Sequence, residues 1–247
     1  MCTLTWQPTA TRGYEVVFSR DEQRTRPLAE APRYRTAGKR LMIAPRDPQG
    51  GGTWIFANER GITGCILNRY DEDDQPAPDF SVPVISRGRL LLGLAAAEGR
   101  QEIVDAIGQG VASGCYRPFI LWVMLPWGGP TTWVWDGTTL AQNPAPLEGI
   151  IATSAFNGPS VRRSREAAYA GRLPRLDLDG FHRAPGVQAD AHSVRMSRPD
   201  ARTVSLTRVR LDGETVRMDY APREGDGGFA ETRTVTLGLA LTAEGVR

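Results

Sequence analysis

The sequence of 247 residues is poor in lysine and histidine, and both shortages restrict its chemistry. Lys39 is the only lysine, although lysine and arginine together number 30. The chain therefore has no GxxxxGK phosphate loop, and only one lysine can form a Schiff base. The two histidines, His182 and His192, fit neither an HExxH motif nor another compact ligand spacing. We expect both to be structural or surface residues.

Cysteine is also scarce, and its pattern argues against a metal site. Cys2, Cys65 and Cys115 lie far apart and form no CxxC pair or zinc-ligand spacing. We therefore predict no metal and no cofactor. An odd number of cysteines without an N-terminal signal segment is typical of the reducing cytoplasm, which is the expected location.

Long hydrophobic runs and a strong charge imbalance are missing as well. No apolar stretch reaches the roughly 18 residues that a membrane-spanning helix needs, so we predict no membrane span. A formal net charge of +2 does not favour nucleic acid binding, which usually requires a concentrated basic face. The sequence leaves the oligomeric state open.

The first three residues, Met1-Cys2-Thr3, contain the most informative candidate site. Removal of Met1 would make Cys2 the N-terminal residue, which then has both a thiol nucleophile and a free α-amine that can act as its base. With ordinary pKa values of about 8 for the amine and about 8.5 for the thiol, proton transfer between the two is nearly isoenergetic. The alternative is that Cys2 is only a small apolar residue at the start of a strand.

Two short apolar segments, 4–6 and 14–18, predict a hairpin that brings the following residues back toward Cys2. Ser19, Arg20, Asp21 and Glu22 would then lie beside the candidate nucleophile. Arg20 can hold a thiolate or a substrate carboxylate, and Asp21 can anchor the α-ammonium group. A solvated charge cluster is the alternative interpretation of this segment.

Downstream segments alternate between strand and helix patterns. A second hairpin around residues 58–61 predicts a strand that ends at Asn68, whose amide can donate to an oxyanion. The acidic run 71–74 lacks the spacing of an EF-hand loop and is expected to face solvent rather than bind metal. Helical patterns occur at 87–111 and 160–171. Segments 24–40 and 174–191 are predicted to be loops. Further strands are predicted at 119–125, 132–136, 149–154, 203–211, 214–220 and 234–241. This order favours an α+β fold of packed antiparallel sheets with outer helices, forming a single domain over residues 1–247.

Several segments together resemble the NRDE or Transport and Golgi Organisation family, whose sequences begin Met-Cys. The family's Asn-Arg-Asp-Glu segment corresponds to residues 19–22, its Arg-Pro-x-Ala segment to 26–29 and its Gly-Gly-Thr-Trp segment to 51–54. An Asn-x-x-Gly turn at 58–61 and Ser-Arg-Gly at 86–88 follow in the same order. Several motifs in order are far more specific than any one of them.

That family is similar to the cysteine N-terminal-nucleophile hydrolases, which include conjugated bile acid hydrolases and penicillin V acylases. The resemblance implies an αββα sandwich in which Cys2 is the catalytic nucleophile, Arg20 and Asp21 are its neighbours and Asn68 is an oxyanion donor. The sequence departs from the pattern at two positions: Ser19 replaces an asparagine, and Thr153 stands where a second oxyanion asparagine is expected. A late arginine of the site corresponds to either Arg198 or Arg202.

Two functions remain open at this stage. The first is an amidohydrolase in which Cys2 attacks a non-peptide C–N bond of a small molecule. The alternative is a non-catalytic binding or carrier protein for haem or for lipid- or acyl-CoA-type ligands. The departure at Thr153 bears on the choice, because loss of one oxyanion donor typically lowers a rate by two to three orders of magnitude.

Overall fold

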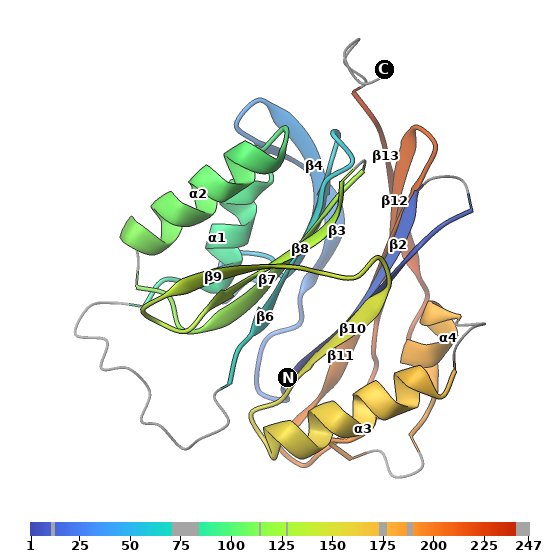
Figure 1. Cartoon of the computed structure of the whole chain (residues 1–247). Coiled ribbons are helices and arrows are strands. Elements are labelled where there is room, and N and C mark those ends of the chain that lie inside the picture. Colours follow the sequence, from blue (N-terminus) through green and yellow to red (C-terminus); the bar gives the residue numbers. More distant parts are fainter. Residues whose placement is uncertain are drawn as a thin grey trace.

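The fold consists of two antiparallel sheets packed face to face, with helices on both outer sides (Figure 1). A computed structural model describes residues 1–10, 13–70, 84–113, 115–126, 128–172, 177–186 and 190–240. The acidic run 71–74 and part of the predicted loop 174–191 lie outside these residues. Among the helices of the described ranges, none is long and apolar enough to cross a membrane.

The first sheet contains the candidate nucleophile, in the strand order β10-β1-β2-β11-β12-β13. Its strands are β1 (Cys2–Pro8), β2 (Tyr14–Gln23), β10 (Gly149–Thr153), β11 (Ala201–Asp212), β12 (Thr215–Pro222) and β13 (Arg233–Gly238). The predicted hairpin is confirmed, because β1 and β2 pair with Cys2 opposite Arg20. Strand β10 pairs with the other edge of β1, so that Thr153 also lies opposite Cys2.

The second sheet follows the chain order β3-β4-β5-β6-β7-β8-β9. Its strands are β3 (Glu30–Ala37), β4 (Arg40–Arg46), β5 (Ile55–Asn58), β6 (Thr63–Asn68), β7 (Phe119–Leu125), β8 (Gly129–Trp135) and β9 (Leu140–Pro144). The hairpin of β5 and β6 is confirmed, with Gly61 at a φ of 71° in its turn. Strand β7 is largely buried, as its continuous apolar sequence predicts for a strand covered on both faces.

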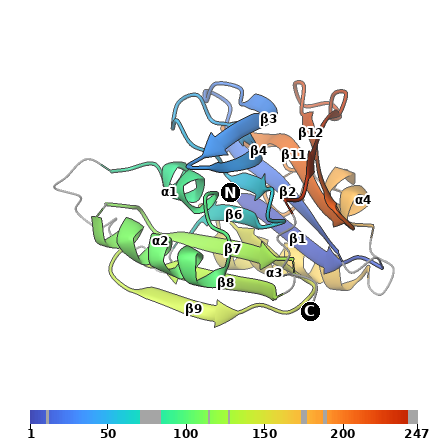
Figure 2. The same cartoon turned by 90° about the horizontal axis from the view of Figure 1, so that it is seen from above.

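Each sheet is covered on its outer face by two helices (Figures 1 and 2). Helices α1 (Arg87–Leu94) and α2 (Arg100–Ser113) pack on the second sheet, and α3 (Gly158–Ala170) and α4 (Leu178–Arg183) pack on the first. The expected αββα sandwich is therefore confirmed.

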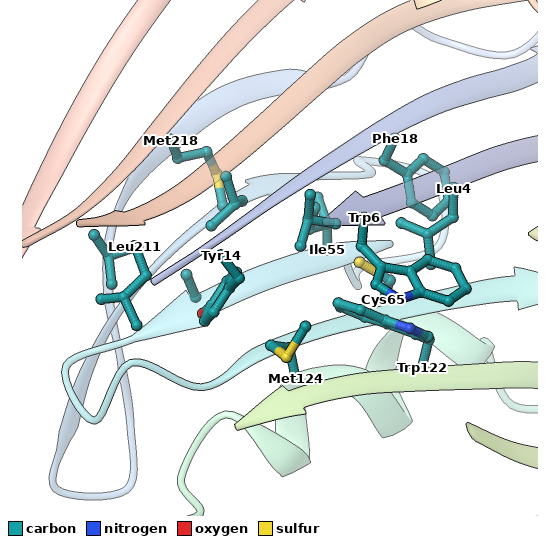
Figure 3. Packing of buried hydrophobic residues seen from close by; sticks show 14 of the residues in the cluster. Leu4, Trp6, Tyr14, Phe18, Ile55, Cys65, Trp122, Met124, Leu211 and Met218 are labelled. Atoms are coloured by element: carbon teal, nitrogen blue, oxygen red, sulfur yellow. The ribbon is translucent and has the colours of Figure 1, made fainter. Parts of the chain in front are cut away.

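The main core lies between the two sheets and determines which side chains face it (Figure 3). Leu4 and Trp6 of β1 face this core together with Phe18 of β2, and the indole rings of Trp6 and Trp122 lie 5.2 Å apart. Successive residues of a strand point to opposite faces. Cys2 and Arg20 therefore face the space between the sheets, whereas Ser19 and Asp21 face α3 and α4.

Three sequence predictions of local structure are wrong. The segment 24–40 contains strand β3, whose exposed, polar residues and Pro32 hide the strand pattern but suit a sheet edge. The segment 174–191 contains helix α4, which is only 6 residues long and therefore gives little periodicity. Helix α3 begins at Gly158 after Asn157, which has a φ of 45°, rather than at the predicted residue 160.

Two glycines explain why the Gly-Gly-Thr-Trp and Ser-Arg-Gly segments occur together. A Cβ atom at Gly52 would lie 2.2 Å from the carbonyl carbon of Gly88, so neither of the two segments tolerates a side chain at this contact. The backbone N–H of Thr53 donates to the Gly88 carbonyl over 3.2 Å. This contact fixes the loop before β5 against the first turn of α1.

Candidate active site

Cys2 is the first residue of β1 and lies between the two strands that pair with β1. Arg20 of β2 and Thr153 of β10 stand opposite Cys2 on either side. Directly opposite residues of antiparallel strands place their side chains on the same face. The thiol, the guanidinium group and the threonine hydroxyl therefore all face the space between the sheets.

The electrostatic environment of Cys2 keeps its thiol protonated while Met1 is attached. Burial is the largest influence and raises the pKa of the Cys2 thiol, and the nearby Asp21 carboxylate adds to the rise. The N-terminal ammonium group, a hydrogen bond from the Asp21 backbone and the Arg20 charge oppose the rise without cancelling it. The free thiol thus has favourable neighbours but is not activated in this form.

The α-ammonium group of Met1 lies in the same enclosed region. Burial disfavours its charged form, but interactions with Cys2, Tyr70 and Asp21 outweigh burial and raise the pKa of the ammonium group. It donates to the Tyr70 hydroxyl over 3.4 Å. The structure therefore already accommodates a positively charged amine beside the thiol.

Arg20 connects the thiol to a network of ion pairs. Its guanidinium group is 5% exposed, lies 4.5 Å above the Trp54 ring and donates to Glu22 over 3.1 Å. Asp47 lies 3.9 Å from Arg20 and 2.5 Å from Arg26. Two arginines and two carboxylates thus hold one another in place, which leaves Arg20 fixed rather than free in solvent. This arrangement excludes the solvated-cluster interpretation for Arg20.

Asp21 is held from the opposite side of the sheet. Arg165 of α3 forms an ion pair with its carboxylate over 3.1 Å, and both side chains are fully buried. The Thr203 hydroxyl donates to the other carboxylate oxygen over 2.6 Å. Arg165 also donates to the Thr3 hydroxyl over 2.6 Å and to the Ala191 carbonyl over 2.8 Å. Asp21 is therefore buried and paired on the face of the first sheet that lies opposite the Cys2 side chain.

Asn68 ends strand β6, as predicted, and reaches the N-terminus through a tyrosine. Its amide donates a hydrogen bond to the Tyr70 hydroxyl over 2.9 Å, and this hydroxyl also accepts a hydrogen bond from the Met1 ammonium group. Tyr70 consequently connects the second sheet to the start of the first. Tyr70 accepts one of the two hydrogen bonds that the Asn68 amide nitrogen can donate, which leaves the other for a substrate oxygen.

Thr153 has a hydroxyl without a partner. The residue is 7% exposed, and its Oγ1 atom is buried and has no hydrogen-bond partner among the described residues. A buried hydroxyl that lacks a partner is costly, typically by about 1–3 kcal/mol. The hydroxyl lies on the same face as Cys2, so it is available to a ligand at this position.

Comparison of the sequence with known families gives one match. Residues 1–125 match the family described as Transport and Golgi organisation 2. The chain belongs to this family. The resemblance expected from the motifs is therefore confirmed, and the match extends from β1 to the end of β7. A search of curated protein sequences finds no match.

Three solved structures with a similar fold are named as an acylase, a hydrolase and an amidase. Penicillin V acylase from Agrobacterium tumefaciens is 14% identical, with a TM-score of 0.54 over 90% of this chain and 83% of its own. A mutant conjugated bile acid hydrolase from Clostridium perfringens is 13% identical, with a TM-score of 0.50 over 100% of both chains. The N-acylethanolamine-hydrolyzing acid amidase orthologue of Caenorhabditis elegans is 9% identical, with a TM-score of 0.51 over 84% of this chain and 92% of its own. At these identities the similarity establishes the fold.

The two candidates for the late arginine are separated in this Transport and Golgi organisation 2 structure. Arg198 lies 4.2 Å above the Phe156 ring, just beyond Thr153, and pairs with Asp200 over 2.9 Å. Arg202 instead donates to the Gly225 carbonyl. Arg198 is therefore the candidate nearer the end of β10.

Three residues of this region, Tyr70, Arg87 and Arg165, were not predicted from the sequence to belong to the site. Tyr70 follows Asn68 by two positions, and Arg165 comes from a helix whose sequence contains other arginines. Arg87 belongs to the Ser-Arg-Gly segment, donates to the Pro118 carbonyl over 2.9 Å and interacts electrostatically with Tyr70 and Cys2. Burial lowers the pKa of the Arg87 guanidinium group. Only Arg87 had a sequence signal, its place in a family motif.

The histidines lie away from the thiol in this family member. His182 is fully buried in α4, where its ring nitrogens contact the hydroxyls of Thr5 over 2.9 Å and Ser19 over 2.7 Å. Burial lowers its pKa to about 3, so the ring is neutral. His192 is partly exposed beside Asp190. Within the described residues no group of three potential metal ligands is present.

Proposed function

We propose that the protein hydrolyses a non-peptide amide of a small molecule, with Cys2 as the nucleophile after removal of Met1. The observation that carries this proposal is the position of Cys2 at the end of β1, opposite Arg20 and beside the unpartnered Thr153 hydroxyl. The enclosed ammonium group next to the thiol supports the proposal, because it shows that a charged amine is accommodated one residue before Cys2.

The proposed reaction has two steps. In the first, the Cys2 sulfur attacks the amide carbonyl while the α-amine takes the thiol proton, and the oxyanion accepts hydrogen bonds from Asn68 and Thr153. The ammonium group then returns the proton to the nitrogen as the C–N bond breaks, which releases the amine and leaves a thioester. In the second, water attacks the thioester with the same amine as base, which releases the acid and the thiol. Arg20 would stabilise the thiolate, and Asp21 would hold the ammonium group.

The test begins with the intact mass of the purified protein, followed by brief substoichiometric alkylation. We expect Met1 to be absent and Cys2 to react well ahead of Cys65 and Cys115. A panel of chromogenic N-acyl anilides then reports turnover. The Cys2→Ala variant should lose at least about 10³-fold in kcat/KM, whereas Cys115→Ala, which alters another partly buried free cysteine, should retain the rate. Equal turnover by wild type and Cys2→Ala would end the proposal.

A binding or carrier protein on the same fold is the second candidate, with haem or a lipid- or acyl-CoA-type molecule as ligand. The raised pKa of the Cys2 thiol in the form that has Met1 favours it, because this form lacks an activated nucleophile. Retention of Met1 in the native protein would make it the preferred function. Titration with haem checks one version of it, since thiolate ligation would shift the Soret band.

A further inference from the structure

Several charged side chains line a pocket that extends from Arg20 away from Cys2. A pocket of about 180 Å³ opens beside the β2-β11-β12 strand ends and is covered by the segment that leads into β3. Its charged lining residues are Arg20, Glu22, Arg26 and Arg233. We call it the arginine pocket.

The charges around the arginine pocket do not cancel. Glu22 lies 3.1 Å from Arg20 and 3.3 Å from Arg26, and Asp47 approaches the same two arginines on their other side. These two arginines and two carboxylates are neutral together. Arg233 forms no ion pair with any residue in the described part of the chain, so the pocket has one uncompensated positive charge.

Arg233 occupies a position where the strand pattern calls for an apolar residue. Arg233 belongs to β13 and pairs with Tyr220 of the neighbouring strand. The next residues of β13 on the same face, Val235 and Leu237, pack against the core between the sheets. The guanidinium group therefore faces the same side as the pocket rather than the outer side of the sheet. Arg233 is the first residue of β13 and is exposed at the edge of the pocket, where its planar guanidinium group can bind a carboxylate through two parallel hydrogen bonds.

The rest of the lining is apolar and is shaped by an irregularity in β11. The pairing of β11 with β2 shifts between Thr203 and Ser205, which leaves Val204 as an extra residue that lines the pocket. Bulges of this kind re-aim a side chain and are frequent next to binding sites. Ala29, Ala31 and Pro222 complete a small apolar wall.

We propose that the arginine pocket binds the carboxylate end of a small, partly apolar monoacid, with Arg233 as the main anion contact. The net single charge matches a monoanion, and the volume suits a chain of about six carbons rather than a large ring system. Because strands lie about 4.8 Å apart, the backbone of Arg233 in β13 is four strand spacings, or about 19 Å, from that of Cys2 in β1. If the proposed hydrolase function holds, the substrate class is an amide that carries a carboxylate at the far end of an apolar chain. This extension rests on the proposed function, whereas acid binding does not.

Binding is measured by calorimetry on the full chain with Cys2→Ala, so that no turnover is needed. Hexanoate is the probe, and hexanamide, hexyl phosphate and inorganic phosphate are the comparison ligands. We expect hexanoate to bind, hexanamide to bind at least tenfold more weakly, and Arg233→Gln to weaken hexanoate binding at least tenfold. Arg163→Gln, which removes another exposed arginine from the outer side of α3, should leave binding unchanged.

The remaining outcomes decide for or against the pocket and separate it from the proposed hydrolase function. Equal binding of hexanoate and hexanamide would show that charge is not recognised, and tighter binding of either phosphate ligand would show a different anion site. Ala31→Leu fills the apolar wall without changing charge and should also abolish hexanoate binding, which protects the test if Arg233→Gln folds poorly. An inactive amide panel with intact hexanoate binding would reject the hydrolase and keep the pocket, and the reverse result would reject the pocket alone.

Discussion

The two faces of the first sheet differ in how completely their polar groups are paired. On the face toward α3 and α4, the buried Asp21 and His182 have close partners on both sides, and Arg165 has partners at both terminal nitrogens but none at Nε among the described residues. On the face toward the second sheet, the Thr153 hydroxyl lacks a partner and the Asn68 amide contacts only Tyr70 among the described residues. Groups that are already satisfied hold a structure together, while buried groups that lack partners are available to a ligand. We therefore propose that the first is a supporting face and the second a binding face.

The sharpest way to test this comparison is to break the buried ion pair on the supporting face. Arg165→Met would leave the Asp21 carboxylate buried without its cation, so we expect the free energy of unfolding to fall by about 3–5 kcal/mol. Urea unfolding measures this change. Arg163→Met on the same helix alters an exposed arginine and should change stability by less than about 0.5 kcal/mol. Similar losses for both variants would mean that Arg165 is no more structural than a surface residue.

The buried histidine gives the supporting face a pH dependence. The pKa of His182 is lowered to about 3 in the folded state, against about 6.5 unfolded. Between these values the unfolded chain binds more protons, so this contribution to stability is complete above pH 6.5 and is lost as pH falls toward 3. We expect it to change by about 1.4 kcal/mol per pH unit between pH 6 and pH 4.

The matched histidine variants separate this contribution from that of the carboxylates. Urea unfolding of His182→Gln between pH 4 and pH 7 should give a flatter profile than wild type. His192→Gln changes the partly exposed histidine and should keep the wild-type slope. Identical slopes for wild type and His182→Gln would show that His182 titrates normally in the folded protein.

How much of the site the sequence predicts depends on how far apart its parts lie in the chain. The pairing of Cys2 with Arg20 follows from one short hairpin, and the position of Asn68 follows from a turn with a glycine. Arg165 was not foreseen, because its helix contains several arginines and only tertiary packing selects the buried one. The pairing of Thr153 with Cys2 joins the two ends of a long stretch of chain, and only the family motif indicated it. Local patterns thus predict hairpins, and long-range contacts complete the site.

The smallest expected effects compare one hydroxyl on each face. Ser19→Ala removes a partner of the buried His182 ring, so stability should fall by about 1–3 kcal/mol, the cost of an unsatisfied buried polar group. Thr153→Val keeps the shape of the side chain but removes a hydroxyl that has no partner among the described residues. Stability should then stay the same or rise by up to about 1 kcal/mol. Urea unfolding of both variants at pH 7 decides the matter: an equal loss for both would mean that Thr153 is as well paired as Ser19, and the distinction between a supporting face and a binding face would not hold.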